Sequence, residues 1–450
     1  YWKVYIHMFE NKKIFILGMA RSGYEAAKVL ANLNNEIIIT DAKDQDKDKV
    51  LELEKLGVKF IKTNEPIEIF DETFDFVVKN PGVPIDHPLI LKAKELNIKV
   101  TNEVEVAYSL LPSGTKIVGI TGSNGKTTTT TLTYEMMKES GLRVHLGGNI
   151  GIPMCALLND VKPNDILVLE IAGHQLHDFI NFKTDVSVMT NLFEVHIDHF
   201  KTFEYYKKTK TRIFDHHTIN DIAIINKNNI DSIIETENIK SKKIFFSSTD
   251  EADIYIKEKA IDFIGEKIIN LNDIRIKGVH NYENIMCAIT VAKQFGVTNE
   301  AIYNVLTRFH GVEHRLEFVN RINNRDFYND SKSTNIKSTQ IALGSFDKPV
   351  ILILGGLDRG HSFDELKPYM KNVKYVICYG ETKFRIKDFC DTNNINCTIV
   401  DDLKIAVKVS YNLSDEGDTI LLSPACASWD QYDSFEQRGE EFKNSVNSLK

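Results

Sequence analysis

The sequence predicts an α/β protein of three domains, each built on an open, mostly parallel sheet. Short apolar runs that end in Gly, Asp or Glu alternate with amphipathic stretches along the whole chain, and this alternation is typical of βαβ units. The chain has 450 residues, 42% of them hydrophobic, which corresponds to about three domains of roughly 100–200 residues each. We place these domains at residues 1–103, 104–310 and 311–450.

The first domain is predicted to be Rossmann-like. Residues 12–18, "KKIFILG", form a β-rich run that ends in glycine, and residues 22–33 have helical spacing and good helix formers. Further buried strands are expected at 36–41 and 74–82. Strand, helix and strand in this order indicate a parallel sheet.

A polar turn follows the first strand. "GMARSG" at 18–23, with Asp41 at the end of the second strand, imitates the fingerprint of a dinucleotide site, in which an acid binds a ribose. Position 20 is alanine, so the G-x-G-x-x-G pattern is incomplete. Three interpretations stay open: a dinucleotide site, a helix N-terminus that holds another phosphate, and a simple turn between strand and helix.

The central domain begins with a glycine loop between a strand and a helix. "KIVGI" leads into "TGSNGKTT" at 121–128, and helix-forming residues follow. The loop glycines let backbone N–H groups converge on an anion, Lys126 can reach the β and γ phosphates, and the Thr127 hydroxyl can ligate Mg²⁺. These features predict a P-loop ATPase-like domain. The position five residues before Gly125 is Ile120 rather than the first glycine of G-x-x-x-x-G-K-[ST], and the nearer glycine is Gly122. An ordinary glycine turn with an N-capping Thr is the alternative.

Carboxylate and imidazole side chains follow other strands of the central domain. Glu170 lies in the run at 165–173, and His196 and Asp198 come after the run at 185–192. Because the ends of parallel strands face the ligand crevice, these groups can hold a divalent cation. A hydrogen-bonded, purely structural His196 is the alternative.

The third domain is predicted to be a second Rossmann-like α/β sheet. Buried strands are expected at 349–356, 375–380, 397–402 and 418–424. "NDSKSTN" at 329–335 and the segment 424–443 are dense in small polar residues. Such loops can bind a carboxylate or a phosphate through hydroxyls, an ammonium group and helix N-termini, and capped helix starts are the alternative.

Composition limits the class of protein. A net charge of −8 with both signs mixed argues against a nucleic-acid partner. The sequence has no apolar run of about 18 residues, so we expect no membrane insertion, and without a secretion signal we expect a cytoplasmic protein. Six cysteines without a C-x-x-C pair predict neither a zinc ribbon nor a redox pair and fit a reducing compartment.

Together these stretches resemble the Mur ligases, ATP-dependent amide-forming enzymes of peptidoglycan precursor synthesis. The short loop is a trait of that family, and its other motifs are matched in order by "GGNIGIP" (147–153), "HNYEN" (280–284), "EHRLE" (313–317), "NDSKSTN", "GGLDRG" (355–360) and "LSPACASWDQYDSFEQRG" (422–439). The resemblance covers nearly the whole chain. It implies a monomer that uses ATP and two Mg²⁺ sites to join D-glutamate to UDP-N-acetylmuramoyl-L-alanine through an acyl phosphate and a tetrahedral intermediate.

The resemblance also assigns roles by position. The catalytic and metal-binding residues that it implies are Lys126, Thr127, Glu170, His196 and Lys210, with Lys210 carried as a carbamate. The implied ATP-binding residues are Gly122, Ser123, Asn124, Gly125, Lys126, Thr127, Thr128, Asn281, Asn284, Arg315 and Asp330. The implied residues for the UDP-linked substrate are Gly18, Arg21, Ser22, Gly23, Asp41, Asn80, Gly82, Asn149 and His196. The implied D-glutamate-binding residues are Lys332, Thr334, Arg359, Ser428 and Phe435.

One segment departs from the family's pattern. After the metal-binding glutamate the family usually reads S-S-F-Q-L, whereas residues 172–176 of this chain read "AGHQL". Two hydroxyls and an aromatic ring are therefore absent, and we expect His174 to place a titratable ring near Glu170. The alternative functions are a folylpolyglutamate synthase-like ligase and a non-catalytic nucleotide-binding protein.

Overall fold

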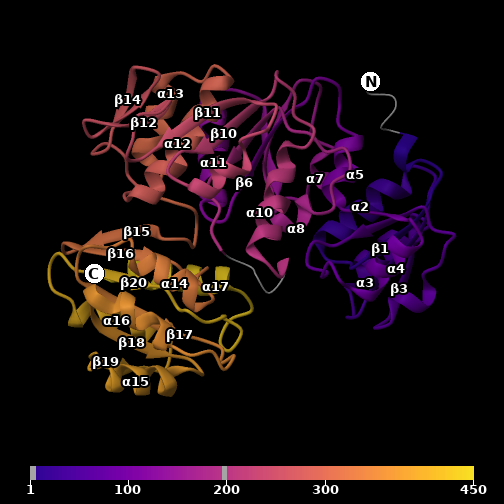
Figure 1. Cartoon of the computed structure of the whole chain (residues 1–450). Coiled ribbons are helices and arrows are strands. Elements are labelled where there is room, and N and C mark those ends of the chain that lie inside the picture. The colour runs from indigo at the N-terminus through magenta and orange to yellow at the C-terminus, as the bar shows by residue number, and fades with distance from the viewer. Residues whose placement is uncertain (1–6, 195–199, 450) are drawn as a thin grey trace. The chain divides into compact units, whose positions relative to one another are not determined.

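The structure, a computed structural model, describes residues 7–194 and 200–449 and confirms a mixed α/β chain with three sheets (Figure 1). The chain divides into two compact units, one that ends at Arg308 and one that begins at Phe309. The first unit holds two of the sheets and the second unit holds the third. The three-domain boundaries near residues 103 and 310 stay predictions.

The first sheet is parallel throughout, as predicted, with strand order β3-β2-β1-β4-β5. Runs such as "KIFIL" and "FVVK" form strands because their apolar, largely β-branched and aromatic side chains are buried. The strand order reverses between β1 and β4, and ligands of such sheets bind at that point. The elements are β1 (Lys13–Leu17), α2 (Arg21–Ala31), β2 (Glu36–Asp41), α3 (Lys47–Lys55), β3 (Lys59–Lys62), β4 (Phe76–Lys79), α4 (Pro88–Glu95), β5 (Lys99–Thr101) and α5 (Glu103–Ser109).

The second sheet has nine strands in the order β14-β13-β12-β11-β10-β9-β6-β8-β7. The predicted runs became the parallel strands β6, β8 and β9. The other parallel strands and the antiparallel edge formed by β12, β13 and β14 were not predicted. Helix α12 packs against α6. The strands are β6 (Lys116–Thr121), β7 (Val144–Gly148), β8 (Ile166–Glu170), β9 (Val186–Met189), β10 (Ile222–Asn226), β11 (Lys242–Ser247), β12 (Ile254–Lys257), β13 (Ala260–Phe263) and β14 (Glu266–Asn270). The helices are α6 (Lys126–Glu139), α7 (Met154–Leu157), α8 (Gly173–Leu176), α10 (Phe203–Thr211), α11 (Ile230–Glu235), α12 (Val279–Gln294) and α13 (Asn299–Arg308).

The third sheet has the order β15-β16-β20-β17-β18-β19 and is parallel except for the β15–β16 hairpin. Every residue of β17 is buried, which fits its unbroken apolar sequence "VILILG". The elements are β15 (Glu317–Ile322), β16 (Arg325–Asn329), α14 (Ile336–Leu343), β17 (Val350–Gly355), β18 (Val373–Tyr379), α15 (Lys383–Thr392), β19 (Cys397–Ile399), α16 (Leu403–Leu413), β20 (Thr419–Leu422) and α17 (Phe435–Asn447). Among the described residues, no helix has both the length and the apolar character that a membrane span requires.

Candidate functional site

The glycine loop joins β6 to α6, as the sequence predicted. Gly122 and Gly125 have φ angles of 138° and 83°, which side chains rarely permit. A Cβ at Gly125 would lie 2.1 Å from the side-chain oxygen of Asn284, so this position has no room for a larger residue. Gly125 caps α6 without any side-chain hydrogen bond. The N-terminus of α6, the end of a helix at which anions bind, therefore lies at this loop.

Residues at the end of β9 hold the loop in place. Thr190 donates its hydroxyl to the Asn124 carbonyl at 2.6 Å, and the Asn124 amide donates to the Asn191 side chain at 2.9 Å. The Ser123 hydroxyl lies 2.9 Å from the Tyr206 hydroxyl. These contacts give the loop a fixed shape, as a preorganised phosphate site requires.

The Lys126 ammonium lies against the loop. Its Nζ donates to the carbonyl oxygens of Gly122 at 3.0 Å and Ser123 at 2.9 Å. Thr127 and Thr128 follow in the first turn of α6, and both are buried. The positive charge and the open helix N-terminus thus belong to the same short segment.

Glu170 connects the loop to the segment at 147–153. The carboxylate, which is 2% exposed, ends β8 and accepts one hydrogen bond from Thr127 Oγ1 and one from Asn149 Nδ2, both at 2.8 Å. Three residues that the sequence assigned to metal and substrate binding therefore lie together. The other candidates in this group, His196 and Asp198, are outside the described residues.

Lys210 is a buried amine at the same site. It lies on α10, is 2% exposed, and donates from Nζ to the Thr121 hydroxyl at 3.1 Å. Burial lowers the pKa of Lys210 well below its usual value, the nearby charge of Lys126 lowers it further, and Glu170 offsets part of the effect. The site therefore favours the neutral amine.

The "AGHQL" segment at 172–176, which differs from the family's pattern, packs on Phe200. His174 stacks on the Phe200 ring with 5.3 Å between centroids and an interplanar angle of 3°. A Cβ on Gly173 would lie 2.9 Å from Phe200 Cζ and 3.4 Å from Lys210 Cε. The absence of a side chain at Gly173 therefore leaves space for the Phe200 ring, and the imidazole of His174 stacks on that ring.

Replacing Gly173 with serine is expected to destabilise the protein by about 1–3 kcal/mol, because the buried Phe200 ring must move. The measurement is the midpoint of thermal unfolding followed by circular dichroism. Ala172→Ser is the matched control, since position 172 already carries a Cβ. Equal midpoints for Gly173→Ser and Ala172→Ser would show that the ring yields without cost.

The turn after β1 gathers the residues predicted for the UDP-linked substrate. Asn80 donates to Ser22 Oγ at 3.2 Å and accepts from the Gly82 amide at 3.1 Å. At Gly23, a Cβ would lie 2.0 Å from the Gly18 carbonyl oxygen. These contacts draw the turn and the "KNPG" segment into one cluster at the carboxyl ends of β1 and β4.

Asp41 and Arg21, which are also predicted to bind the UDP-linked substrate, make further hydrogen bonds around this turn. Asp41 accepts from the amides of Met19 and Lys43, each at 2.9 Å, so its carboxylate holds the turn. Arg21 donates to the Gly151 carbonyl at 3.2 Å, which ties the turn to the segment that carries Asn149.

The remaining residues predicted to bind ATP are distributed over both units. Asn284 is buried on α12, where Thr129 Oγ1 donates to it at 3.4 Å, and Asn281 donates to the Lys277 carbonyl at 2.9 Å. Arg315 and Asp330 belong to the second unit. Asp330 accepts from Ser423 Oγ at 2.8 Å and from the Leu316 amide at 3.1 Å, and burial raises its pKa to about 6.

The predicted D-glutamate residues belong to the second unit, where all lie on loops except Phe435, which begins α17. Lys332 and Thr334 follow β16, and Lys332 Nζ lies 5.7 Å from the centre of the Phe435 ring. Ser428 is buried. Arg359 stacks its guanidinium 4.9 Å from the ring of Trp429, which is 64% exposed.

Sequence reasoning missed Arg438. This residue of α17 is fully buried, with Nε donating to Ser331 Oγ at 3.0 Å and Nη2 donating to the carbonyl oxygens of Ser331 at 2.8 Å and Cys426 at 3.0 Å. Ser331 also donates to the Phe435 carbonyl at 2.7 Å. One guanidinium therefore joins the "NDSKSTN" loop to the loop that carries Ser428. The only signal in the sequence is its place within the long motif at 422–439.

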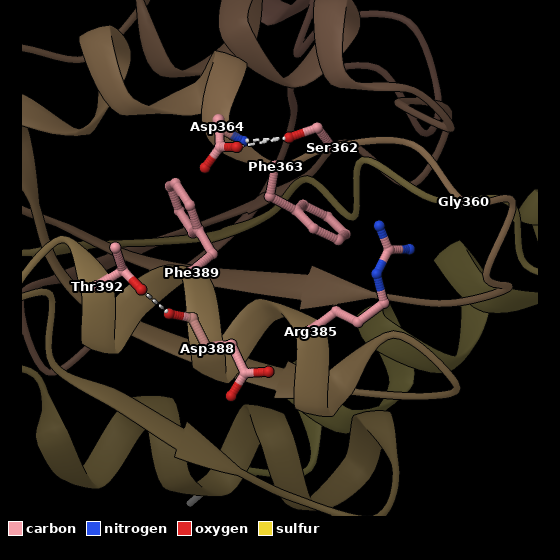
Figure 2. Close-up of a pocket in the computed structure, with 8 residues that line it drawn as sticks. All are labelled: Gly360, Ser362, Phe363, Asp364, Arg385, Asp388, Phe389 and Thr392. Atoms are coloured by element: carbon pink, nitrogen blue, oxygen red, sulfur yellow. Dashed lines mark hydrogen bonds between the residues drawn. The ribbon is translucent and has the colours of Figure 1, made fainter.

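A cavity of about 260 Å³ lies beside the "GGLDRG" motif but contains none of the predicted site residues. Figure 2 shows the rings of Phe363 and Phe389 and the Arg385 side chain at its wall. Arg385 forms an ion pair with Asp358 and donates to the His361 carbonyl at 2.6 Å. Arg385 therefore holds the loop that carries Arg359. The lining residues are Gly360, Ser362, Phe363, Asp364, Arg385, Asp388, Phe389 and Thr392.

Comparison with known proteins identifies the family to which the chain is similar. A family model described as the Mur ligase middle domain matches residues 120–292, and one described as the Mur ligase, glutamate ligase domain, matches residues 314–426. The UDP-N-acetylmuramoylalanine--D-glutamate ligase of Bacillus cereus (strain G9842) is 43% identical over 445 residues, which is 98% of each chain. The protein of the same name from Bacillus anthracis (strain A0248) is 44% identical over 446 residues, again 98% of each chain.

Solved structures share the fold at low identity. The MurF ligase from Thermotoga maritima in complex with ADP is similar with a TM-score of 0.59 and 18% identity, covering 98% of this chain and 99% of that one. The UDP-N-acetylmuramate-alanine ligase MurC from Thermotoga maritima gives a TM-score of 0.58 and 16% identity, with 98% and 100% covered. With the family models and the full-length relatives, these likenesses agree on one assignment. The chain belongs to the Mur ligase family.

Proposed function

We propose that this chain is an ATP-dependent ligase that joins D-glutamate to UDP-N-acetylmuramoyl-L-alanine. The observation that carries the proposal is the cluster of Thr127, Asn149 and Glu170 at the glycine loop, in a chain whose relatives of that name align over 98% of its length. The change from S-S-F-Q-L to "AGHQL" leaves this cluster in place.

The glycine loop would bind the phosphates of ATP. The amides of the first turn of α6 supply donors, and the Lys126 ammonium neutralises negative charge that develops on the transferred phosphate. Because the ammonium of Lys126, the first residue of α6, already lies on the loop, it is placed before ATP arrives. This preorganisation lowers the barrier without any rearrangement during the reaction.

The residues around Glu170 fit a magnesium ion. A buried carboxylate and the Thr127 hydroxyl are the hard oxygen ligands that Mg²⁺ prefers. We propose that Glu170, Thr127, His196 and a carbamate on Lys210 would hold it. When bound, the ion supplies positive charge beside the phosphates. The lowered pKa of Lys210 supports the carbamate, because only a neutral amine adds to CO₂.

The reaction would run in two transfers. The carboxylate of UDP-N-acetylmuramoyl-L-alanine attacks the γ-phosphorus of ATP, the bond to the β–γ bridging oxygen breaks, and ADP leaves. The amine of D-glutamate then attacks the acyl phosphate, and phosphate leaves from the tetrahedral intermediate. Since acyl phosphates hydrolyse readily, the site must exclude water during this sequence.

The test of the function is phosphate release with each component omitted in turn. We expect release only when ATP, UDP-N-acetylmuramoyl-L-alanine and D-glutamate are all present. L-Glutamate, meso-diaminopimelate and L-lysine serve as controls for the amino acid. A comparable rate with any of these three would overturn the assignment of D-glutamate.

Replacing Arg438 with lysine is expected to raise KM for D-glutamate by about 10–100-fold, since hydrogen bonds from a buried charge contribute roughly 1.5–3 kcal/mol. Lysine keeps the charge but cannot reach the carbonyls of Ser331 and Cys426 together. We expect KM for ATP and kcat to change much less, because Arg438 contacts Ser331 and Cys426 and, in the part of the chain that the structure describes, makes no hydrogen bond to Asp330. Steady-state kinetics with each substrate varied separately is the measurement.

Gln437→Ala, at the exposed neighbouring position of α17, is the control for the Arg438 variant. An equal rise in KM for ATP and for D-glutamate would show that Arg438 supports the second unit as a whole. Unchanged KM values would show that the two loops keep their positions without the guanidinium.

A further inference from the structure

Three cysteines come together at the edge of the third sheet. Cys378 lies on β18, Cys390 on α15, and Cys397 begins β19, the edge strand. The Sγ atoms of Cys378 and Cys397 are 3.4 Å apart. All three are free thiols. The proposed ligase reaction uses none of them.

The sheet register explains why two of these side chains meet. Cys397 pairs with Val376 across the parallel strands, and Val376 lies two residues before Cys378 on β18. Residues two apart on a strand point to the same face, so Cys378 and Cys397 lie diagonally on one face of the sheet. Helix α15 packs against both strands and brings Cys390 to the same place.

The three thiols differ in the direction in which their pKa is shifted. Hydrogen bonds from Cys378 and Cys390 lower the pKa of Cys397, and the charge of Lys387 lowers it further. The same contacts, together with burial, raise the pKa of Cys378 and of Cys390. These contacts favour the thiolate form at Cys397 over its two neighbours.

Solvent access singles out the same residue. Cys397 is half-buried on the edge strand, whereas Cys155, Cys287, Cys378, Cys390 and Cys426 are buried. A thiolate that small molecules can reach, beside a second thiol at contact distance, is the arrangement of reactive cysteines.

We propose that Cys397 and Cys378 form a reversible thiol–disulfide site that reacts with hydroperoxides. The Cys397 thiolate attacks one peroxide oxygen, the O–O bond breaks, and hydroxide leaves and takes a proton, which gives a sulfenic acid. The Cys378 thiol then attacks the Cys397 sulfur, the S–O bond breaks, and water leaves with the thiol proton. Two thiols lose two electrons and hydrogen peroxide gains them, and a small dithiol reverses the change.

The test is disulfide mapping in the full-length protein. After treatment with hydrogen peroxide and alkylation of the remaining thiols, trypsin yields Tyr375–Lys383 with Cys378, and Asp388–Lys404 with both Cys390 and Cys397. We expect these two peptides to be joined with the alkyl group on Cys390, and to separate after reduction. An alkyl group on Cys397 in the joined pair would overturn the stated pairing. A disulfide between Cys390 and Cys397 would instead leave Asp388–Lys404 alone and lighter by two hydrogen atoms, which would overturn the stated pairing.

A second measurement tests the thiolate without peroxide. For an ordinary thiol the rate of iodoacetamide alkylation falls roughly 100-fold between pH 8 and pH 6, because the thiolate fraction falls. At Cys397 we expect a fall of less than about threefold, with free N-acetylcysteine in the same tube as the reference thiol. The double change Cys378→Ala and Cys390→Ala should restore the ordinary dependence.

The wild-type results decide the proposal even if the double variant does not fold. A Cys397 rate that follows the N-acetylcysteine reference would overturn it. So would oxidation of Cys397 to a sulfinic acid with no joined peptide. Because phosphate release is not the readout of either measurement, failure here leaves the proposed ligase function untouched.

Discussion

Replacing Lys126 with alanine is expected to lower the rate of phosphate release by at least about 100-fold, which corresponds to roughly 3 kcal/mol of transition-state stabilisation. The ammonium lies on the glycine loop, with Nζ held by the carbonyls of Gly122 and Ser123. Alanine removes the charge that neutralises the transferred phosphate. The measurement is the initial rate of phosphate release with all three substrates at saturation.

The fold of the Lys126 variant is expected to stay intact, because the lysine packs on a loop whose shape rests on Thr190, Asn191 and Tyr206. Lys138→Ala, in the last turn of the same helix, is the matched control for loss of a charge from α6. If Lys126→Ala stays within a few-fold of Lys138→Ala, the lysine does not act on the phosphate.

The parallel strands could be predicted because their signal is local. Runs such as "IVGI" at 117–120 and "VILIL" at 350–354 are apolar throughout and are followed by a polar residue or glycine, as strands covered on both faces are. The loop from Gly122 to Gly125 was predictable for the same reason, since its conformation depends on glycines within the loop itself.

The antiparallel edge of the second sheet carried no such signal. The β12–β13 hairpin turns at Glu258 and Lys259, which have φ angles of 47° and 61°. Asn or Gly usually occupies positions with this left-handed conformation. Glu258 and Lys259 are neither, so nothing in the sequence indicates the turn. The strands on either side have only four residues each, so their alternation is too short to recognise.

Contacts set by tertiary packing were also beyond the sequence. From the sequence, the departure at 172–174 indicates the loss of two hydroxyls and of an aromatic ring, and a titratable ring near Glu170. The structure shows instead that Gly173 accommodates Phe200 and that His174 stacks on it. An arginine on a helix is usually exposed, yet Arg438 is fully buried between two loops. The cysteines at 378, 390 and 397 lie in no motif, and only the register of β18 and β19 brings two of them into contact.

Replacing Lys210 with alanine is expected to lower activity by at least about 100-fold, and millimolar bicarbonate or short carboxylic acids are expected to restore part of it. An unmodified ammonium at this buried position would repel Mg²⁺, whereas a carbamate supplies oxygens at the same reach. Alanine leaves a space beside Thr121 that a small carboxylate can occupy. The measurement is phosphate release against additive concentration, with chloride at equal ionic strength as the blank.

The pH dependence of the wild-type protein gives a further check on Lys210. Carbamate formation consumes the neutral amine and releases a proton, so acid opposes it and higher pH favours it. Because burial lowers the pKa of Lys210, the neutral form persists to a lower pH than for an ordinary lysine. We therefore expect activity lost in CO₂-free buffer at acid pH to return when bicarbonate is added at neutral pH. Lys208→Ala, at an exposed position of the same helix, keeps Lys210 and should lose and regain activity as the wild-type protein does. Full activity of Lys210→Ala without any additive would show that the lysine carries no carbamate that the reaction needs.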